Sequence, residues 1–214
     1  MNVLLDLDGT LTDPRAGIVG SIRYALEQLG EALPSDDRLA RCIGPPLHSS
    51  FGDLLQTSDH KRIDLAVEKY RERYSERGIF ENSVYPGVPE ALARLSSHGA
   101  RLLVATSKPK VFADRIIQHF DLGANLDSVW GSELDGMRSD KGMLIEHIIM
   151  RTKIDPGASI MVGDLEHDAI GARANGLLAA GALWGYGSRE ELRAAGCAVF
   201  LQSPSEMVKL VNQQ

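Results

Sequence analysis

Cysteine is scarce in this sequence, and long apolar runs are missing. Cys42 and Cys197 are the two cysteines among 214 residues, and neither has a CxxC partner or a histidine at zinc-finger spacing. We therefore expect buried, unreactive thiols in a reducing cytoplasm. No stretch approaches the roughly 20 apolar residues that a membrane helix requires. The opening MNVLLDLDGT also lacks the basic region of a signal peptide, so we expect a cytoplasmic protein without a membrane partner.

Positive charge is not in excess either. The chain has 23 Lys and Arg against 29 Asp and Glu, a formal net charge of −6. Such a balance gives no reason to expect a nucleic acid polymer or an anionic membrane as partner. No GxGxxG follows the first apolar run, and no GxxxxGK[ST] occurs, which argues against a dinucleotide-binding dehydrogenase and a P-loop enzyme. Any phosphate site must therefore be built locally, from a metal or a few placed cations.

Short apolar runs alternate with helical patterns along most of the chain. The runs are continuous rather than alternating with polar residues, which indicates strands buried on both faces. They cover residues 3–5, 102–105, 159–162 and 198–201, with a weaker run at 177–183. The helical patterns between them cover residues 89–98, 111–120, 141–151 and 167–175. This order predicts an α/β fold with a Rossmann-like parallel sheet covered by helices.

Residues 15–82 follow a different pattern, with helical apolar stripes and no strand run. The stripes are Ile18, Ile22, Ala25, Leu26 and Leu29, then Ile63, Val67, Tyr70 and Tyr74. We predict that this segment is an inserted α-helical cap domain. The core domain then consists of residues 1–14 and 83–214.

Three helix ends carry local signals. Asp13 before Pro14 predicts an N-cap followed by proline at the first helical position. Ser203 before Pro204, with Glu206 after it, predicts a capping box. Gly99 is typical of the residue that follows a helix C-terminus.

Polar clusters follow the predicted strands at the points where they end. They are Asp6-Leu7-Asp8-Gly9-Thr10, Thr106-Ser107-Lys108-Pro109 and Gly163-Asp164-Leu165-Glu166-His167-Asp168. The carboxyl ends of parallel strands share one edge of a sheet, so these clusters should meet there, within reach of Lys141 on a helix. Each cluster alone is more simply a cap, a turn or a solvated charge. Their joint occurrence, each at a strand end, indicates a functional site.

The chemistry of these clusters is mutually consistent. Carboxylates such as Asp6, Asp8 and Asp164 would repel one another without a cation, and hard oxygen ligands favour Mg²⁺. An anion would find hydroxyl donors in Thr106 and Ser107, backbone N–H groups near Asp8, and the Lys141 ammonium. The residues therefore predict a phosphate site beside a magnesium ion.

With these motifs in order, the sequence resembles the haloacid dehalogenase (HAD) superfamily of phosphatases. Asp6–Asp13 is similar to its first motif, Thr106-Ser107 to the second, Lys141 to the third and Gly163–Asp168 to the fourth. The cap between the first two motifs resembles the phosphoglycolate phosphatase-like subgroup. Two further stretches resemble members described as 5′-nucleotidase-like: Gly131-Ser132-Glu133-Leu134-Asp135-Gly136 and Trp184-Gly185-Tyr186-Gly187.

The resemblance implies a role for each matching residue. Asp6 would be the nucleophile that forms an aspartyl-phosphate, and Asp8 the general acid and base. Mg²⁺ would be held by the Asp6 carboxylate, the Asp8 backbone carbonyl and Asp164, with Asp168 acting directly or through water. Ser107 and Lys141 would bind phosphoryl oxygens, supported by Thr106. An alkoxide leaving group needs a proton and a halide does not, so Asp8 favours phosphoryl transfer over dehalogenation.

The cap bears on the substrate. Ile43–Ser50 resembles the cap loop that faces the active site in related enzymes, and Gly44, Pro45 and His48 would contact substrate there; a plain loop between cap helices is the alternative. We predict hydrolysis of a small phosphorylated metabolite, with a nucleoside 5′-monophosphate favoured slightly over 2-phosphoglycolate. A phosphomutase and a non-catalytic phosphate-binding regulatory module are the alternatives. A monomer or a homodimer is expected.

Overall fold

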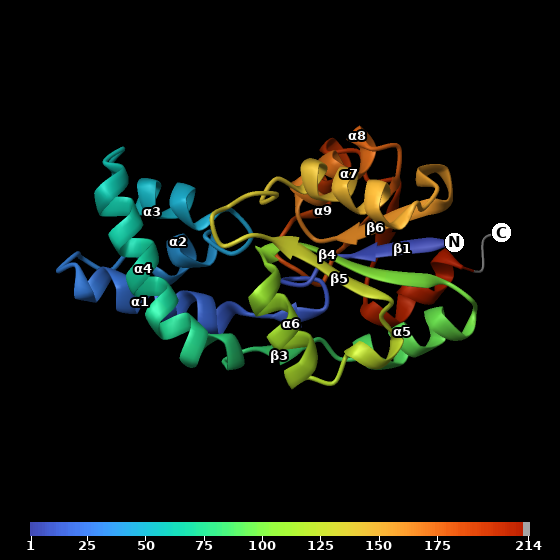
Figure 1. Cartoon of the computed structure of the whole chain (residues 1–214), viewed down its shortest axis with the longest axis horizontal. Coiled ribbons are helices and arrows are strands. Elements are labelled where there is room, and N and C mark those ends of the chain that lie inside the picture. Colours follow the sequence, from blue (N-terminus) through green and yellow to red (C-terminus); the bar gives the residue numbers. More distant parts are fainter. Residues whose placement is uncertain (212–214) are drawn as a thin grey trace. The chain divides into compact units, whose positions relative to one another are not determined.

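A six-stranded parallel sheet forms the centre of the larger of two units in the chain (Figure 1). The computed structural model describes residues 1–211. The larger unit comprises Met1–Asp13 and the chain from Val84 onward, and the smaller one comprises Pro14–Ser83. The strands of the sheet are β1 (Asn2–Leu5), β4 (Arg101–Pro109), β5 (Ser128–Ser132), β6 (Ser159–Gly163), β7 (Leu178–Ala182) and β8 (Val199–Leu201).

The strand order places β1 near the middle of this sheet. The order is β5-β4-β1-β6-β7-β8, and every neighbouring pair is parallel. Along the chain, β4 and then β5 are added on one side of β1, and β6, β7 and β8 are then added on its other side. The direction in which strands are added therefore reverses between β1 and β6. In open parallel sheets, ligands bind at such a switch point, beyond the carboxyl ends of the strands.

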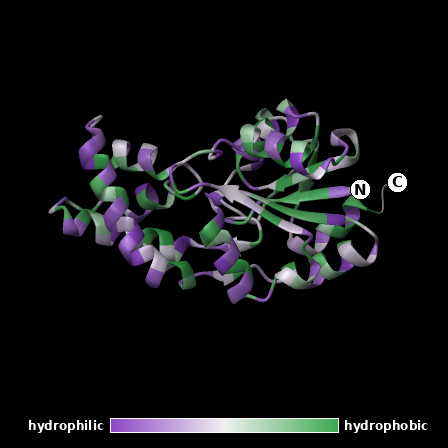
Figure 2. Cartoon of the chain, viewed as in Figure 1, coloured by the Kyte–Doolittle hydropathy of each residue, from purple (hydrophilic) through white to green (hydrophobic). Residues whose placement is uncertain are grey.

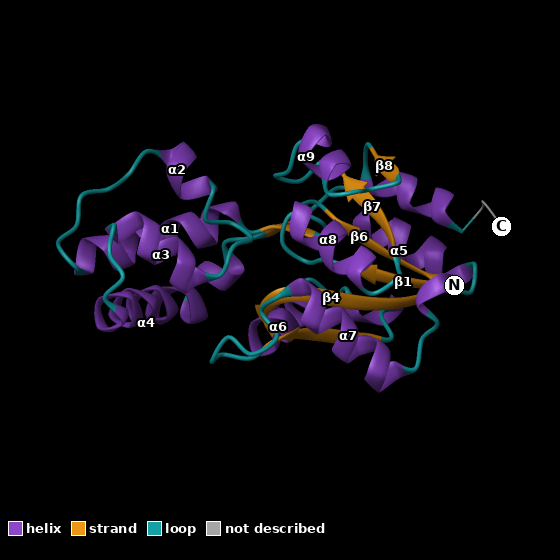
Figure 3. Cartoon of the chain, turned by 90° about the horizontal axis from the view of Figure 1, so that it is seen from above, coloured by secondary structure: helices purple, strands orange, loops and turns teal. Residues whose placement is uncertain are grey.

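Helices cover both faces of the sheet, as Figures 1 and 3 show. One face carries α5 (Val88–Ser97), α6 (Lys110–His119) and the 3₁₀ segment η4 (Pro204–Leu210), of which α5 and η4 pack together. The other carries α7 (Lys141–Thr152), α8 (Glu166–Ala174) and α9 (Arg189–Ala194), with α8 in contact with both α7 and α9. Short 3₁₀ segments η2 (Gly123–Asn125) and η3 (Pro156–Ala158) lie in connections.

The central strands are mostly hydrophobic, whereas the helices around them mix hydrophobic and hydrophilic residues (Figure 2). Leu4 on β1 pairs in register with Leu103 on β4 and Met161 on β6, and all three are buried. Burial of apolar surface on both faces of these central strands stabilises the sheet and fixes the strand ends in place. The predicted α/β fold with a Rossmann-like parallel sheet is confirmed.

The smaller unit is helical. It contains α1 (Arg15–Gln28), α2 (Asp36–Ala40), α3 (Leu47–Leu55), α4 (His60–Glu76) and the 3₁₀ segment η1 (Gly78–Phe80). Helix α4 packs against α1 and α3. The predicted stripes form its core: Ile22 and Leu26 are buried on α1, and on α4 the rings of Tyr70 and Tyr74 stack with centroids 5.1 Å apart. No strand lies within residues 15–82, all of which the structure describes.

The segments that join the two units pair with each other. They are β2 (Thr12–Asp13) and β3 (Ser83–Val84), which form a separate two-stranded sheet. The predicted boundaries at 14/15 and 82/83 fall one residue from the limits of the two units. That the smaller unit acts as a cap over a substrate stays a prediction.

Several local predictions were wrong. The strand β5 was not expected, because its sequence SVWGS has only two adjacent apolar residues, Val129 and Trp130, and it lies at the edge of the sheet. Asp13 lies in β2 and Pro14 is the N-cap of α1, with no side-chain cap bond. The capping box predicted at Ser203 is absent, since Ser203 makes no side-chain cap bond and the segment after it is the 3₁₀ segment η4 rather than an α-helix. Glu206 instead accepts a hydrogen bond from the backbone N–H of Gln202. The expected cap loop is helical from Leu47 onward, because α3 begins there.

The local predictions for Gly99 and for the burial of the two cysteines were confirmed. Gly99 follows α5 in the left-handed conformation, with φ +77°. Cys42 and Cys197 are free thiols, and both are buried. Among residues 1–211, no helix combines the length and the apolar character that a membrane crossing needs.

Candidate active site

The chain turns sharply after β1, and this turn places two carboxylates at the switch point of the sheet. Asp6 still belongs to the ladder, since its backbone N–H donates to Val162 on β6 over 2.9 Å. Gly9 then adopts φ +86°, and a Cβ at this position would lie 2.2 Å from Asp164 Oδ2. Only glycine suits both the left-handed turn and this close approach. The turn therefore brings the Asp6 segment directly against the Asp164 carboxylate.

Three buried carboxylates meet at this point. Oxygen atoms of Asp6, Asp164 and Asp168 all lie within 4.8 Å of one another. Asp164 follows the last residue of β6 and accepts hydrogen bonds from Thr10 Oγ1 at 3.2 Å and from the Tyr186 backbone N–H at 2.9 Å. Asp168 lies in the first turn of α8, where its Oδ2 accepts from the Leu165 backbone N–H. Asp6 and Asp164 directly follow two different strands, β1 and β6, so the sheet topology is what assembles the cluster.

Lys141 provides a buried cation to this cluster. It is the first residue of α7, and the Asp140 side chain caps that helix by accepting from the Met143 N–H. Its Nζ lies 2.8 Å from Asp6 Oδ1, 2.7 Å from Asp168 Oδ1 and 2.9 Å from the Ala105 carbonyl oxygen. An ammonium has three N–H groups, and these three acceptors match them. The arrangement favours a role for Lys141 in holding the two carboxylates; its predicted contact with phosphoryl oxygens stays a prediction.

Burial sets the protonation behaviour of the cluster. It raises the pKa of Asp168 to about 6, even though Lys141 acts in the opposite direction. It also raises the pKa of Asp164 well above its ordinary value, helped by the charges of Asp168 and Asp6. Burial disfavours the charged form of Lys141, but the Asp168 and Asp6 carboxylates outweigh this and raise its pKa. When all three are ionised, the carboxylates carry more negative charge than one ammonium compensates.

This excess of buried negative charge fits a divalent cation. Within the described part of the chain, Asp8 Oδ1 is a buried oxygen that accepts no hydrogen bond. Hard carboxylate oxygens with no histidine or cysteine among them suit Mg²⁺. The predicted metal residues are therefore brought together, with Asp6, Asp164 and Asp168 as carboxylate donors and the turn at Asp8 beside them.

Asp8 has a partner that the sequence interpretation missed. Lys108 Nζ lies 2.7 Å from Asp8 Oδ2, and their side chains are 6% and 12% exposed. Burial raises the pKa of Asp8, while Lys108 opposes this increase. The one sequence signal for Lys108 was its place directly after Ser107, at the end of a buried strand.

The residues of the second predicted motif lie at the end of β4. Thr106 is buried, and its Oγ1 accepts a hydrogen bond from the Lys108 backbone N–H at 3.2 Å. Ser107 is half-buried, and its carbonyl accepts from Ser132 Oγ at 2.8 Å. Thr106 therefore shapes the strand end that presents Ser107 and Lys108.

The stretch Trp184–Gly187 lies against the first motif. Trp184 Nε1 donates to the Thr10 carbonyl over 2.9 Å. Tyr186 donates from its backbone to Asp164, and from its hydroxyl to Asp13 Oδ1 over 2.5 Å. Tyr186 and Thr10 thus hold the Asp164 carboxylate from two sides, a role that motif matching alone did not assign to them.

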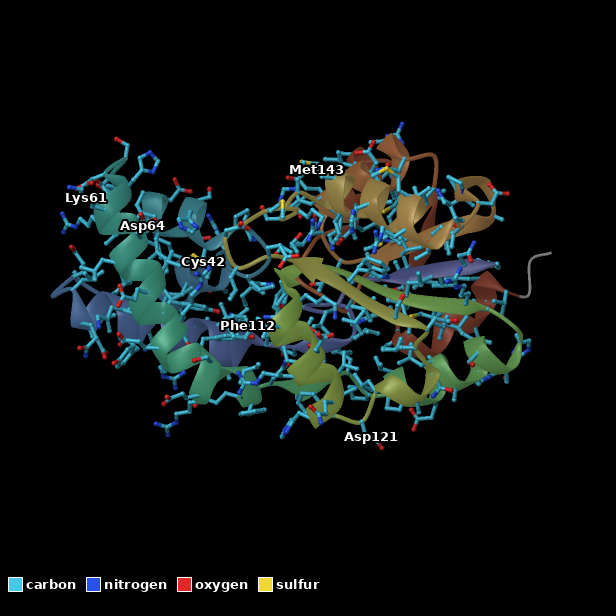
Figure 4. The ribbon with its side chains drawn as sticks, in the orientation of Figure 1. Cys42, Lys61, Asp64, Phe112, Asp121 and Met143 are labelled. Carbon is cyan, nitrogen blue, oxygen red and sulfur yellow. The ribbon has the colours of Figure 1, made fainter. Side chains whose placement is uncertain are left out.

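The three predicted substrate residues of the cap belong to the smaller unit. Gly44 has φ +103° and Pro45 follows it, while His48 lies on α3 with its Nε2 3.2 Å from Asp64 Oδ1. Figure 4 labels Asp64, on α4. His48 and Asp64 also line a cavity of about 470 Å³ within this unit. Contact of Gly44, Pro45 and His48 with substrate stays a prediction.

Comparison with known proteins assigns the family. The model of the haloacid dehalogenase-like hydrolases matches residues 3–182. A 5′-nucleotidase of Pseudomonas aeruginosa is 46% identical over 195 residues, covering 90% of this chain and 87% of its own. The tyrosine-protein kinase PtkA of Mycobacterium tuberculosis is 38% identical over 185 residues, 86% of this chain and 62% of its own. The crystal structure of a predicted phosphatase from Clostridium acetobutylicum superposes with a TM-score of 0.93 at 38% identity, covering 100% of this chain and 98% of its own. The chain therefore belongs to the haloacid dehalogenase-like hydrolase family, and within it to the phosphatases.

Proposed function

We propose that this phosphatase is magnesium-dependent and cleaves a nucleoside 5′-monophosphate through an aspartyl-phosphate on Asp6. The observation that carries this proposal is the buried cluster of Asp6, Asp164 and Asp168 around Lys141, with Asp8 on the same turn as Asp6. The proposed nucleophile, acid–base group and hard ligands thus share one edge of the sheet. Acyl-phosphate chemistry needs all three within reach of one phosphorus atom.

The metal would be held by the carboxylates of Asp6, Asp164 and Asp168 and by the backbone carbonyl of Asp8. When bound, Mg²⁺ would withdraw charge from phosphoryl oxygens and offset the negative charge of its ligands. The protein keeps these ligands in place without it: Lys141 holds Asp6 and Asp168, while Thr10 and Tyr186 hold Asp164.

In the first step, a carboxylate oxygen of Asp6 attacks phosphorus and the bond to the leaving alkoxide breaks. Asp8 gives its proton to that oxygen as the bond breaks. Burial raises the pKa of Asp8, which favours the protonated form that this step requires. Four carboxylates face two ammonium groups in this site, so an incoming phosphate dianion also meets less repulsion when Asp8 is neutral.

In the second step, the ionised Asp8 takes a proton from water, and the water oxygen attacks the same phosphorus. The bond between phosphorus and Asp6 then breaks, releasing inorganic phosphate and restoring the Asp6 carboxylate. Ser107, near the end of β4, would donate a hydrogen bond to a phosphoryl oxygen in both steps.

A nucleoside 5′-monophosphate is the proposed substrate because the 46% identical relative from Pseudomonas aeruginosa is named a 5′-nucleotidase, and that match covers 90% of this chain. 2-Phosphoglycolate is the second substrate to test, on the subgroup resemblance of the cap. The cap residues Gly44, Pro45 and His48 are proposed to contact the leaving group. A cytoplasmic location and a monomeric or homodimeric state also stay predictions.

The test is release of inorganic phosphate from a panel of monoesters, with Mg²⁺ and with EDTA. The panel holds nucleoside 5′-monophosphates, 2-phosphoglycolate, sugar phosphates and p-nitrophenyl phosphate. We expect metal-dependent release, fastest with a nucleoside 5′-monophosphate. Full activity in EDTA would contradict the metal role. Isomerisation of a sugar phosphate without phosphate release would show a mutase instead.

A further inference from the structure

The end of β4 contains an irregularity from which Lys108 reaches the active site. In the pairing of β4 with β5, Thr106 is opposite Gly131 and Pro109 is opposite Ser132, so Ser107 and Lys108 are two extra residues on β4. Such a bulge bends the strand and changes the direction of the side chains in it. The Lys108 side chain is 6% exposed and reaches Asp8, although Lys108 is separated from that residue by about half the chain.

The bulge is built by specific neighbours on β5. A Cβ on Gly131 would lie 2.6 Å from the Lys108 carbonyl oxygen and 2.8 Å from the Lys110 backbone, so no larger residue fits there without a backbone shift. Ser132 Oγ donates to the Ser107 carbonyl at 2.8 Å. On β4 itself, Thr106 Oγ1 accepts from the Lys108 N–H. The close packing of Gly131 and these two hydrogen bonds hold the backbone at Lys108 from both strands.

The ion pair at the tip of this bulge involves one oxygen of Asp8. Lys108 Nζ lies 2.7 Å from Asp8 Oδ2, whereas Asp8 Oδ1 is buried and accepts no hydrogen bond from the residues that the structure describes. Pairing one carboxylate oxygen with a buried ammonium fixes the rotation of the carboxyl group. The other oxygen is then held in one direction.

We propose that Lys108 is a positioning residue for the acid–base group Asp8, and that the bulge shaped by Gly131 and Ser132 places Lys108 beside Asp8. This inference rests on the proposed function, because it assigns a partner to the residue that protonates the leaving group. It also gives a role to the stretch beginning at Gly131-Ser132, whose sequence pattern had no structural explanation. A direct contact of Lys108 with the phosphoryl group is the competing role.

The leaving group distinguishes the two roles. A nucleoside leaves as an alkoxide and needs the proton from Asp8, whereas p-nitrophenolate leaves without one. If Lys108 acts through Asp8, Lys108→Met should lower kcat for a nucleoside 5′-monophosphate by about 10- to 100-fold, and kcat for p-nitrophenyl phosphate by less than about 3-fold, with KM little changed. Lys108→Arg should recover part of the kcat lost with the nucleotide, since guanidinium also pairs with carboxylates.

A double-mutant cycle with Asp8→Asn adds a second readout. Adding Lys108→Met to Asp8→Asn should change the remaining nucleotide activity by less than about 3-fold, because the group that Lys108 positions is already gone. Gly131→Ala provides an independent route to the same defect: it should displace the bulge and give the leaving-group dependence of Lys108→Met. Lys110→Met is the matched control, because Lys110 forms an exposed pair with Asp114 at 2.7 Å on the same segment.

Each outcome has a defined meaning. An equal loss with both substrates, or a full further loss in the Asp8→Asn background, would show that Lys108 binds the phosphoryl group and would overturn the proposal. Wild-type activity of Lys108→Met, with Asp8→Asn impaired, would overturn it while leaving the proposed function intact. Absence of phosphate release by the unmodified enzyme would instead reject the proposed function.

Discussion

Lys141 Nζ donates a hydrogen bond to Asp6 Oδ1 over 2.8 Å, although 135 residues separate the two in the sequence. The same ammonium forms the ion pair with Asp168, and both carboxylates are buried. Lys141 is thus the link between the β1 turn and the first turn of α8. Its removal would leave buried carboxylates without their compensating charge.

We therefore expect Lys141→Met to destabilise the metal-free protein by about 3–5 kcal/mol, the usual cost of removing one partner from a buried ion pair. Thermal or urea unfolding in EDTA measures this. Mg²⁺ should recover part of the loss, because it supplies positive charge to the same carboxylates. A variant as stable as the unmodified protein in EDTA would show that Lys141 does not hold the cluster. Lys69→Met, at an exposed pair with Glu72, is the matched control.

The raised pKa of Asp168 predicts how stability depends on pH. Burial places that pKa at about 6 in the folded state, against an ordinary value of 3.8. The folded metal-free protein therefore binds more protons than the unfolded chain in this range. The resulting stabilisation is fully present below pH 3.8 and is lost as pH rises through about 6. Unfolding free energies in EDTA between pH 4 and pH 8 should show this loss in the unmodified protein relative to Asp168→Asn, which lacks the titrating group.

The same shift predicts that Mg²⁺ binds more weakly below pH 6. Protons compete with the metal for Asp168 and Asp164, whose pKa values are both raised by burial. The increase in unfolding temperature caused by Mg²⁺ should be large at pH 8 and small at pH 5. An equal increase at both values would contradict this placement of the metal, and a normal increase in Asp164→Asn would remove Asp164 from the ligand set.

Tyr186 connects Asp164 with the segment that leads out of the larger unit. Its backbone holds Asp164, so Tyr186→Phe keeps that bond and removes the hydrogen bonds of the hydroxyl, to Asp13 and to Tyr85. We expect about 1.5–3 kcal/mol of destabilisation, the range for a hydrogen bond to a charged group, with kcat changed less than about 3-fold. Urea unfolding and steady-state kinetics measure the two effects. Tyr24→Phe is the control, because that hydroxyl has only a long bond to an exposed Glu72. A large loss of kcat would show that the hydroxyl serves the chemistry.

The sequence predicted the parts of the molecule that depend on buried strands and their ends. The central strands are continuously apolar, so the positions of Asp6 and Asp164 at one edge followed from the general rule for parallel sheets. The edge strand β5 was not predicted because only two of its residues, Val129 and Trp130, form an apolar run. Asp13 was interpreted as a helix cap from local spacing alone, and its tertiary partner Tyr186 lies 173 residues away.

The contacts of the residues around the motifs were harder to predict, because they also depend on neighbours that are distant in the sequence. Lys108 reaches Asp8 from a bulge in β4, and the residue that leaves room for this bulge, Gly131, lies on another strand. No spacing within the segment 106–109 reveals that contact. The roles of Gly44, Pro45 and His48 depend on how a substrate meets the smaller unit, so they remain predictions.

Labelling of Asp6 during turnover tests the central claim most directly. The enzyme would be mixed with a nucleoside 5′-monophosphate carrying radiolabelled phosphate, quenched in acid and digested. The account predicts label on the peptide that contains Asp6, release of that label by hydroxylamine, and none in Asp6→Asn, whose turnover should fall at least about 1,000-fold. Asp114→Asn, an exposed surface change, should label normally. Continued turnover without label on Asp6, or label retained by Asp6→Asn, would contradict the assignment of Asp6 as the nucleophile.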